Sequence, residues 1–168
     1  MENTKIAKEV DETLTGLIKP ISSFTPEQIN EIPFEGSWTA GQLAQHMIMA
    51  NSGFVEIING PFKETERDPD KWVPRFKEDF SNFGIKMRSP DFVNPETKAY
   101  NKEELLSALK SIREKILKAI ETLDLTKTCM AFELPVYGYV TRLEAVYFVI
   151  CHTQRHIYQL KNIQKGIK

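Results

Sequence analysis

The sequence predicts an all-α fold, a four-helix bundle with a long crossover between the second and third helices. Four long stretches carry apolar residues at the three- and four-residue spacing of an amphipathic helix. Three of these stretches begin just after a Thr or Asn that is followed three residues later by Glu or Gln, the pattern of a helix cap. No stretch alternates polar and apolar residues for long enough to indicate a regular strand.

The ends of the predicted helices follow from their flanking residues. The first helix should stop before Pro20, because proline lacks the amide N–H that continues a helix. The others should start after the caps Thr39, Asn101 and Thr141, and Gly166 suits the end of the last one. The expected ranges are residues 4–19, 40–58, 102–123 and 142–165.

The predicted crossover, Pro61–Tyr100, is too long and too aromatic for a plain linker. Long connections without structure are uncommon in compact domains. We therefore expect a short helix near residues 70–82, with the aromatic side chains packed over one end of the bundle. The pattern leaves open whether they only cover the core or also form a functional lid. Residues 132–140 could hold a short extended piece. The aromatics of the crossover are Trp72, Phe76, Phe80, Phe83, Phe92 and Tyr100.

The composition predicts a single domain spanning residues 1–168. The chain is 41% hydrophobic and 27% charged, with a net charge of −1, as in soluble globular domains. Because positive and negative charges balance, the protein has no overall positive potential that would attract nucleic acid or an anionic membrane. We expect neither as a partner. Two cysteines without a CxxC motif, and an N-terminus without the signal-peptide pattern, favour a reduced, cytoplasmic setting.

The three histidines of the chain are the strongest candidates for a functional site. His152 and His156 are four residues apart, so their rings share one face of the predicted helix. His46 falls within the apolar stripe of the second helix. Imidazoles buried together need partners, and neutral imidazole is the commonest metal ligand. The pattern supports two interpretations equally: a shared divalent metal ion, or three separately hydrogen-bonded core histidines.

Several polar residues accompany these histidines. Arg155 and Gln159 continue the polar face of the helix and could orient a substrate carboxylate, although Arg155 would serve equally well in a salt bridge at the rim. Glu144, Glu133 and Gln45 are candidates to accept hydrogen bonds from the free ring nitrogens. Three imidazoles suit zinc, nickel, copper or iron. Three protein ligands leave a coordination position open, as in catalytic zinc sites.

Two segments resemble the DinB/YfiT-like superfamily. Residues 37–46, SWTAGQLAQH, resemble the start of that family's second helix, where a Trp precedes the cap and a ligand His follows. Residues 135–160 are similar to its fourth helix, in which a glycine-containing loop and a capped start precede H-x-x-R-H-x-x-Q. The resemblance covers the layout of nearly the whole chain.

This resemblance implies a four-helix bundle, often homodimeric, in which His46, His152 and His156 bind nickel, zinc or a similar ion. Some members are metal-dependent thiol S-transferases that use bacillithiol or mycothiol, and others are described only as metal-dependent hydrolases. It thus implies a small-molecule substrate, with a low-molecular-weight thiol as one candidate. The competing hypothesis is a non-catalytic metal-binding or stress-related binding protein. A metal that faces a cavity would favour the enzyme, and a fourth protein ligand would favour the alternative.

Overall fold

The structure is a computed structural model that describes residues 2–168, and it is built mainly of helices. The all-α class is confirmed; of the predicted domain, only Met1 lies outside the described residues. Within residues 2–168 there are five α-helices, two single-turn 3-10 helices and one two-stranded sheet. The elements are α1 (Glu2–Ser23), η1 (Gln28–Asn30), α2 (Ala40–Asn59), β1 (Phe62–Lys63), α3 (Val73–Ser81), η2 (Asp91–Val93), α4 (Lys102–Thr122), β2 (Thr128–Cys129) and α5 (Arg142–Gly166).

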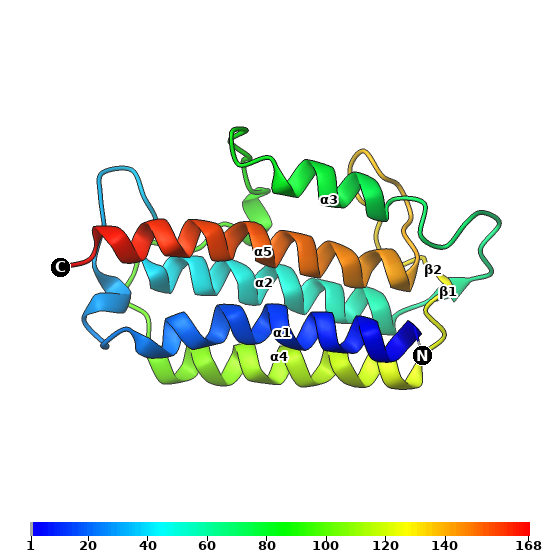
Figure 1. Cartoon of the computed structure of the whole chain (residues 1–168), viewed down its shortest axis with the longest axis horizontal. Helices are drawn as coiled ribbons and strands as arrows, with labels where there is room; N and C mark the ends of the chain where they lie inside the picture. The colour runs from blue at the N-terminus through cyan, green and yellow to red at the C-terminus, as the bar shows by residue number, and fades with distance from the viewer. Residues whose placement is uncertain (1) are drawn as a thin grey trace.

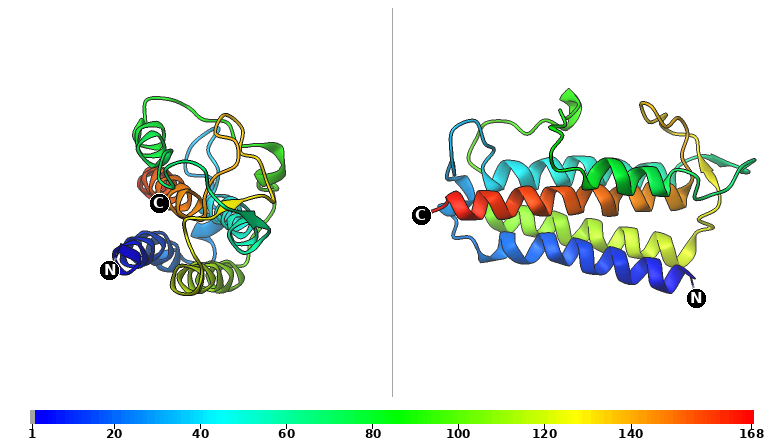
Figure 2. Two further views of the ribbon diagram at one scale, coloured as in Figure 1. Left: turned by 90° about the vertical axis from the view of Figure 1, so that its right-hand side faces the viewer. Right: turned by 45° about the horizontal axis from the view of Figure 1, so that its top comes forward.

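The four long helices lie side by side (Figure 1). Helices α1 and α2 each pack against both α4 and α5, so the order around the common axis of these helices is α1, α4, α2, α5. The end-on view of Figure 2 shows this order, with α3 outside the set and against α5. None of the helices in residues 2–168 combines the length and the apolar character needed to cross a membrane.

The core between these helices is divided by a polar layer. One apolar cluster includes Phe54 of α2 and Val149 of α5, and the other includes Met47 of α2 and Leu160 of α5. Between the two clusters, α2 and α5 bury polar side chains, which is costly unless each finds a partner. This layer is the part of the core where a polar site can form. Its buried members are His46, Asn51, Thr153 and His156.

The predicted caps start their helices as expected. Thr39 and Thr141 each form a complete capping box, with Gln42 and Glu144 respectively. Asn101 accepts a hydrogen bond from the backbone N–H of Glu104 at 3.0 Å. Each cap satisfies backbone groups that have no partner within the helix. The caps therefore explain why α2, α4 and α5 begin within one residue of the predicted positions.

The prediction that the first helix ends before Pro20 is wrong, because α1 continues to Ser23. Ile21 is fully buried in the second apolar cluster, and this burial favours one more helical turn. The Ser22 and Ser23 hydroxyls donate to the carbonyls of Lys19 and Pro20, which stabilises the end of the helix. Burial and end capping thus outweigh the hydrogen bond that proline removes.

The crossover contains the predicted short helix, but it packs on a different surface. Helix α3 runs along α5, on the outside of the long helices, and does not cover an end of the bundle (Figure 2). Phe76 and Phe80 are buried there and contact the Phe148 ring edge-on, at centroid distances of 5.3 and 5.0 Å. Phe83 and Phe92 remain exposed. Phe76 and Phe80 therefore hold α3 against α5.

The extended piece expected over residues 132–140 lies a few residues earlier. Strand β2 pairs antiparallel with β1, opposite Phe62 and Lys63. Within 132–140 the chain instead makes a tight turn, closed by the two hydrogen bonds between Leu134 and Gly138. Val136 and Gly138 have positive φ values in this turn, 77° and 74°, which a regular strand does not allow.

Candidate metal centre

The structure brings the three candidate histidines together across the interface of α2 and α5. The Nε2 atom of His46 lies 3.4 Å from that of His152 and 3.1 Å from that of His156. The remaining pair, His152 and His156, is separated by 3.1 Å. Three Nε2 atoms thus form a nearly equilateral triangle, as the four-residue spacing on α5 allows.

Hydrogen bonds on the other ring nitrogens set the tautomers of two rings. Nδ1 of His46 lies 2.8 Å from the carbonyl oxygen of Val93 in η2, and that oxygen can only accept. Nδ1 of His156 lies 2.8 Å from Oε1 of Gln159. Both rings therefore carry their proton on Nδ1 and direct an Nε2 lone pair at the common centre. The interpretation as three separately hydrogen-bonded histidines does not describe this geometry, because the rings face one another.

The triangle of nitrogen atoms has the size that one metal ion requires. Zinc binds imidazole at about 2.0–2.1 Å in tetrahedral sites, which places two ligand nitrogens about 3.3–3.4 Å apart. The distances here are 3.1–3.4 Å. Among residues 2–168, no Cys, Asp or Glu joins these three histidines as a fourth ligand. The group could hold a divalent metal ion, zinc or nickel among them, with further coordination positions open.

Burial keeps the three imidazoles neutral. It lowers the pKa of His156 to about 3, with a further contribution from the neighbouring His46. Burial also lowers the pKa of His152, helped by both other histidines. The pKa of His46 is lowered by burial as well, although the Val93 carbonyl opposes this shift. Neutral rings are the form that binds a metal.

These lowered pKa values predict that the metal-free protein loses stability on acidification. An unfolded histidine takes up a proton near pH 6.5, whereas folded His156 stays neutral until about pH 3. The unfolded state therefore binds more protons, and stability falls as the pH drops from about 6.5 toward 3. For His156 alone the loss at pH 5 is about 2 kcal/mol. Urea unfolding of chelator-treated protein at pH 7.5 and 5 measures it, and a His156→Gln variant with the same pH dependence would contradict it.

The histidines lie in the wall of a cavity of about 1100 Å³. Helices α2, α3 and α5 contribute to the lining, together with residues 83–93 except Asp91 and residues 131–137 except Glu133. Phe54, Phe80 and Phe148 are among its apolar lining residues. Trp38 contacts the rings of His46 and His156, at centroid distances of 5.1 and 6.4 Å, but does not line the cavity. A metal ion bound by the histidines would therefore be accessible from the cavity.

The remaining candidates divide between this site and other parts of the fold. Gln159 is the partner of His156, as described above, and both it and Arg155 line the cavity. Arg155 donates to the carbonyl of Asn82, at 3.0 Å, and to that of Ile85. Among the described residues, Glu133 and Gln45 make no hydrogen bond to a histidine ring. Sequence reasoning missed the Val93 carbonyl, because a backbone acceptor leaves no signal in the residue type.

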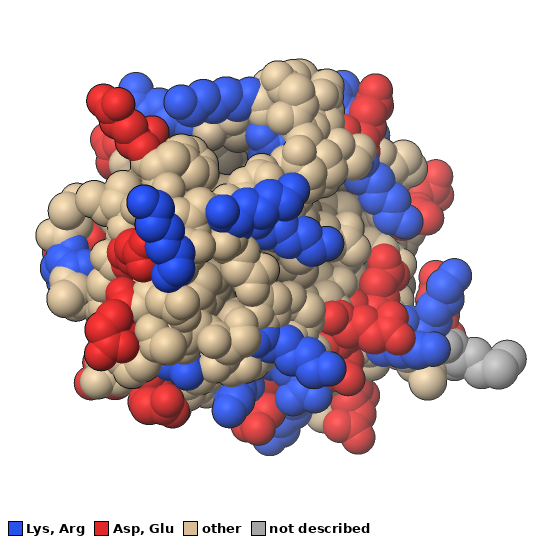
Figure 3. Space-filling model, turned by 60° about the vertical axis from the view of Figure 1, so that its left-hand side comes forward, with Lys and Arg blue, Asp and Glu red and all other residues tan. Residues whose placement is uncertain are grey.

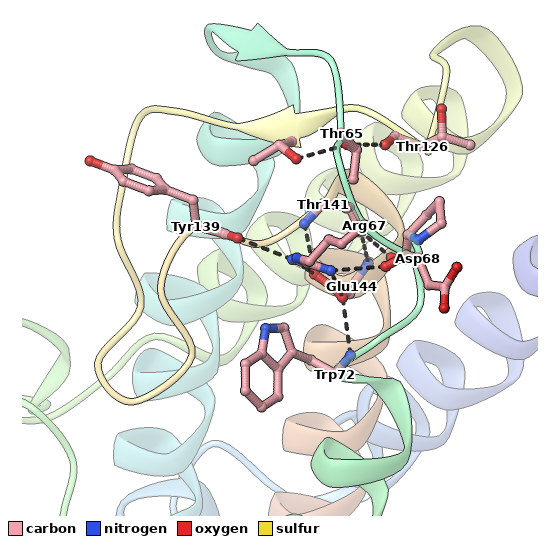
Figure 4. Close-up of polar contacts among 10 residues, drawn as sticks. Thr65, Arg67, Asp68, Trp72, Thr126, Tyr139, Thr141 and Glu144 are labelled. Atoms are coloured by element: carbon pink, nitrogen blue, oxygen red, sulfur yellow. Dashed lines mark hydrogen bonds and ion pairs between the residues drawn. The ribbon is translucent and has the colours of Figure 1, made fainter.

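Glu144 lies away from the histidines and holds the crossover to the start of α5 (Figure 4). Its fully buried carboxylate accepts two hydrogen bonds from Arg67, at 2.7 and 2.8 Å. The backbone N–H groups of Trp72 and Thr141 also donate to it, at 3.0 and 2.9 Å. Glu144 precedes His152 by eight residues, about 12 Å along the helix. The carboxylate thus anchors the chain before α3 and does not orient a ligand.

Comparison with known proteins identifies the family. Residues 9–160 match the model of the DinB superfamily. No match was found among curated proteins, and none among solved structures. The match covers most of the chain and includes all three histidines. The chain therefore belongs to the DinB superfamily.

Proposed function

We propose that this protein is a metal-dependent enzyme that acts on a small molecule, with a zinc or nickel ion held by His46, His152 and His156. The observation that carries the proposal is the convergence of three Nε2 atoms, 3.1–3.4 Å apart, in the wall of a large cavity. A closed structural site needs four protein ligands, whereas catalytic sites keep a position for water or substrate. We propose in addition that the four long helices around the site form a four-helix bundle of the family's type.

A divalent ion at this position would lower the pKa of a bound thiol or water and so supply a nucleophile near neutral pH. Neighbouring residues orient the histidine rings for binding of such an ion. The Val93 carbonyl and Gln159 keep the Nε2 lone pairs of His46 and His156 directed at the common centre. Phe80 and Phe148 pack beside the His152 ring, each at a centroid distance of 5.7 Å, and exclude water from that side.

Between the two reaction classes of the family, thiol S-transfer fits the site better than hydrolysis. Activation of water, with a pKa near 15.7, is helped by a general base, whereas a thiol with a pKa near 8.5 needs much less help. The one carboxylate among the described residues that line the cavity is that of Glu56. Glu56 is ten residues beyond His46 on α2, about 15 Å along the helix. The substrate is then a low-molecular-weight thiol and an electrophilic partner.

The alternative is a metal-binding protein without catalytic activity, in which the ion stabilises the fold. The large cavity beside the histidines favours the enzyme over this alternative, because a purely structural ion needs no access route. The single domain, the homodimer, the cytoplasmic location and the absence of nucleic-acid and membrane partners stay predictions.

A reaction screen with metal-loaded protein tests the proposed function. We expect conjugation of cysteine, bacillithiol or mycothiol to a bimane electrophile to run at least about 100-fold faster than with chelator-treated protein, since metal catalysis contributes several kcal/mol. Addition of zinc or nickel should restore the rate. Hydrolysis of nitrophenyl esters is measured in parallel, as the second class. Equal rates for the metal-loaded protein and its His152→Ala variant in every reaction would refute an enzymatic role.

A further inference from the structure

The cavity beside the histidines combines apolar walls with an uneven set of charges. Its volume of about 1100 Å³ is at the upper end for sites that bind small organic molecules. Apart from the histidines, the ionic side chains among its described lining residues are those of Lys86, Arg88, Arg155 and Glu56. The lining thus contains three basic residues and one acidic residue, in a chain whose net charge is −1. The cavity is more basic than the protein as a whole.

Two of these bases are available to a ligand. Within residues 2–168, neither Lys86 nor Arg88 takes part in an ion pair, and both side chains are exposed. Arg155, in contrast, already donates to the carbonyls of Asn82 and Ile85. On the face shown in Figure 3, Lys and Arg side chains border a hollow. An anion that enters the cavity can therefore pair with Lys86 and Arg88 without displacing a carboxylate.

The segment that carries both bases, residues 82–93, is attached at its two ends to the helices that carry the histidines. At its start, Arg155 of α5 binds two of its carbonyls, and Phe83 stacks on Tyr158 of α5 at a centroid distance of 4.1 Å. At its end, the carbonyl of Val93 accepts from His46 of α2. These anchors hold the two basic residues over the same cavity that the histidines line.

These observations identify a chemical class of ligand. Arg and Lys bind carboxylate, sulfonate and phosphate groups through charge-assisted hydrogen bonds, and a positive cavity concentrates anions. The apolar walls suit a hydrocarbon or aromatic body. We infer that the cavity binds an amphipathic organic anion, whose charged group meets Lys86 and Arg88 and whose apolar body lies along Phe80 and Phe148. Its assignment as a substrate rests on the proposed function, whereas its binding does not.

Fluorescence titration with a matched pair of probes tests this inference. Dansyl-labelled undecanoate carries the anion, and its primary amide has the same apolar body without the charge. We expect the acid to bind the wild-type protein about 3- to 10-fold more tightly than the amide, a difference of about 0.7–1.4 kcal/mol, because ion pairs at partly exposed sites are weak. In the K86Q/R88Q variant this preference should disappear, with the affinity for the amide unchanged.

The K115Q/K118Q variant is the matched control, because it removes two exposed bases from α4, outside the cavity. It should keep the preference for the acid. Equal binding of acid and amide to the wild type, or an equal loss in the control variant, would overturn the inference. The titrations are made with both metal-loaded and chelator-treated protein. If the protein binds the metal ion but binds the acid no more tightly than the amide, this inference is refuted and the proposed function is not. If the protein prefers the acid but binds no metal ion, the proposed function is refuted and this inference is not.

Discussion

Replacement of His152 by alanine is expected to abolish stoichiometric metal binding. The wild-type protein should bind one zinc or nickel ion after reconstitution, because its three Nε2 atoms already lie 3.1–3.4 Å apart. His152 is the most informative of the three ligands, because its Nδ1 is buried and has no hydrogen-bond partner among the described residues. Its replacement therefore removes a ligand nitrogen without breaking a hydrogen bond of the other ring nitrogen. Replacement of His46 or His156 would break such a bond.

A graded comparison makes the result quantitative. Loss of a hydrogen-bond partner behind a metal ligand typically weakens binding about 10- to 100-fold. We expect Gln159→Leu, which removes the partner of His156, to show a loss of that size, and His152→Ala to show a larger one. Elemental analysis gives the stoichiometry, and competition with a chelator gives the affinity. Circular dichroism confirms that both variants are folded.

Binding should also appear as a gain in stability. At a free-ion concentration 100 times the dissociation constant, the ion stabilises the folded wild type by about 2.7 kcal/mol, and His152→Ala should show none of this gain. Wild-type protein that carries no stoichiometric ion after reconstitution would contradict the metal assignment. A His152→Ala variant that binds the ion as tightly as the wild type would contradict it equally.

Local sequence signals determine most of the fold. The caps at Thr39, Asn101 and Thr141 act through their own backbone neighbours, so their helices could be placed without tertiary information. The end of α1 could not, because continuation past Pro20 depends on the burial of Ile21 among residues distant in the sequence. The surface on which α3 packs is also a tertiary property, decided by contacts such as that of Phe76 with Phe148.

The candidate site divides in the same way. The spacing of His152 and His156 on one helix is a local property, and it predicts that these two candidate ligands share a face. The distance of His46 from them depends on how α2 and α5 pack, which the apolar stripes indicate only approximately. The Val93 carbonyl and the attachment of residues 82–93 involve backbone atoms, for which any residue type serves. For Glu144, a carboxylate in the first turn of the predicted helix suits either a histidine partner or a helix cap, and the structure shows the cap.

Glu144→Gln is expected to destabilise the protein by about 3–5 kcal/mol, the usual effect of breaking a buried ion pair. Each carboxylate oxygen of Glu144 accepts two hydrogen bonds, one from the Arg67 guanidinium and one from a backbone N–H group. A glutamine offers one oxygen and one NH₂ group, so one guanidinium N–H and one backbone N–H would face a donor. Arg67 would also be left without its counter-charge. Urea unfolding at pH 7.5 measures the loss.

Two further variants separate the ion pair from ordinary surface charge. Lys8→Gln removes a member of an exposed pair with Glu12, whose side chains are 76% and 67% exposed, and it should cost less than about 1 kcal/mol. The double variant R67M/E144L should be less destabilised than the sum of its single changes, because it leaves no unpaired charge. Additive losses would mean that the pair contributes no coupling.

The metal content of Glu144→Gln distinguishes an anchor from a ligand partner. The carboxylate lies about 12 Å along α5 from His152, and its contacts hold the chain that leads into α3. The folded variant should therefore still bind one ion with nearly wild-type affinity, although its stability is lower. Its cavity should be less well ordered, since α3 supplies Phe80 to the lining. A variant of wild-type stability that has lost its metal would show that Glu144 acts on the histidines after all.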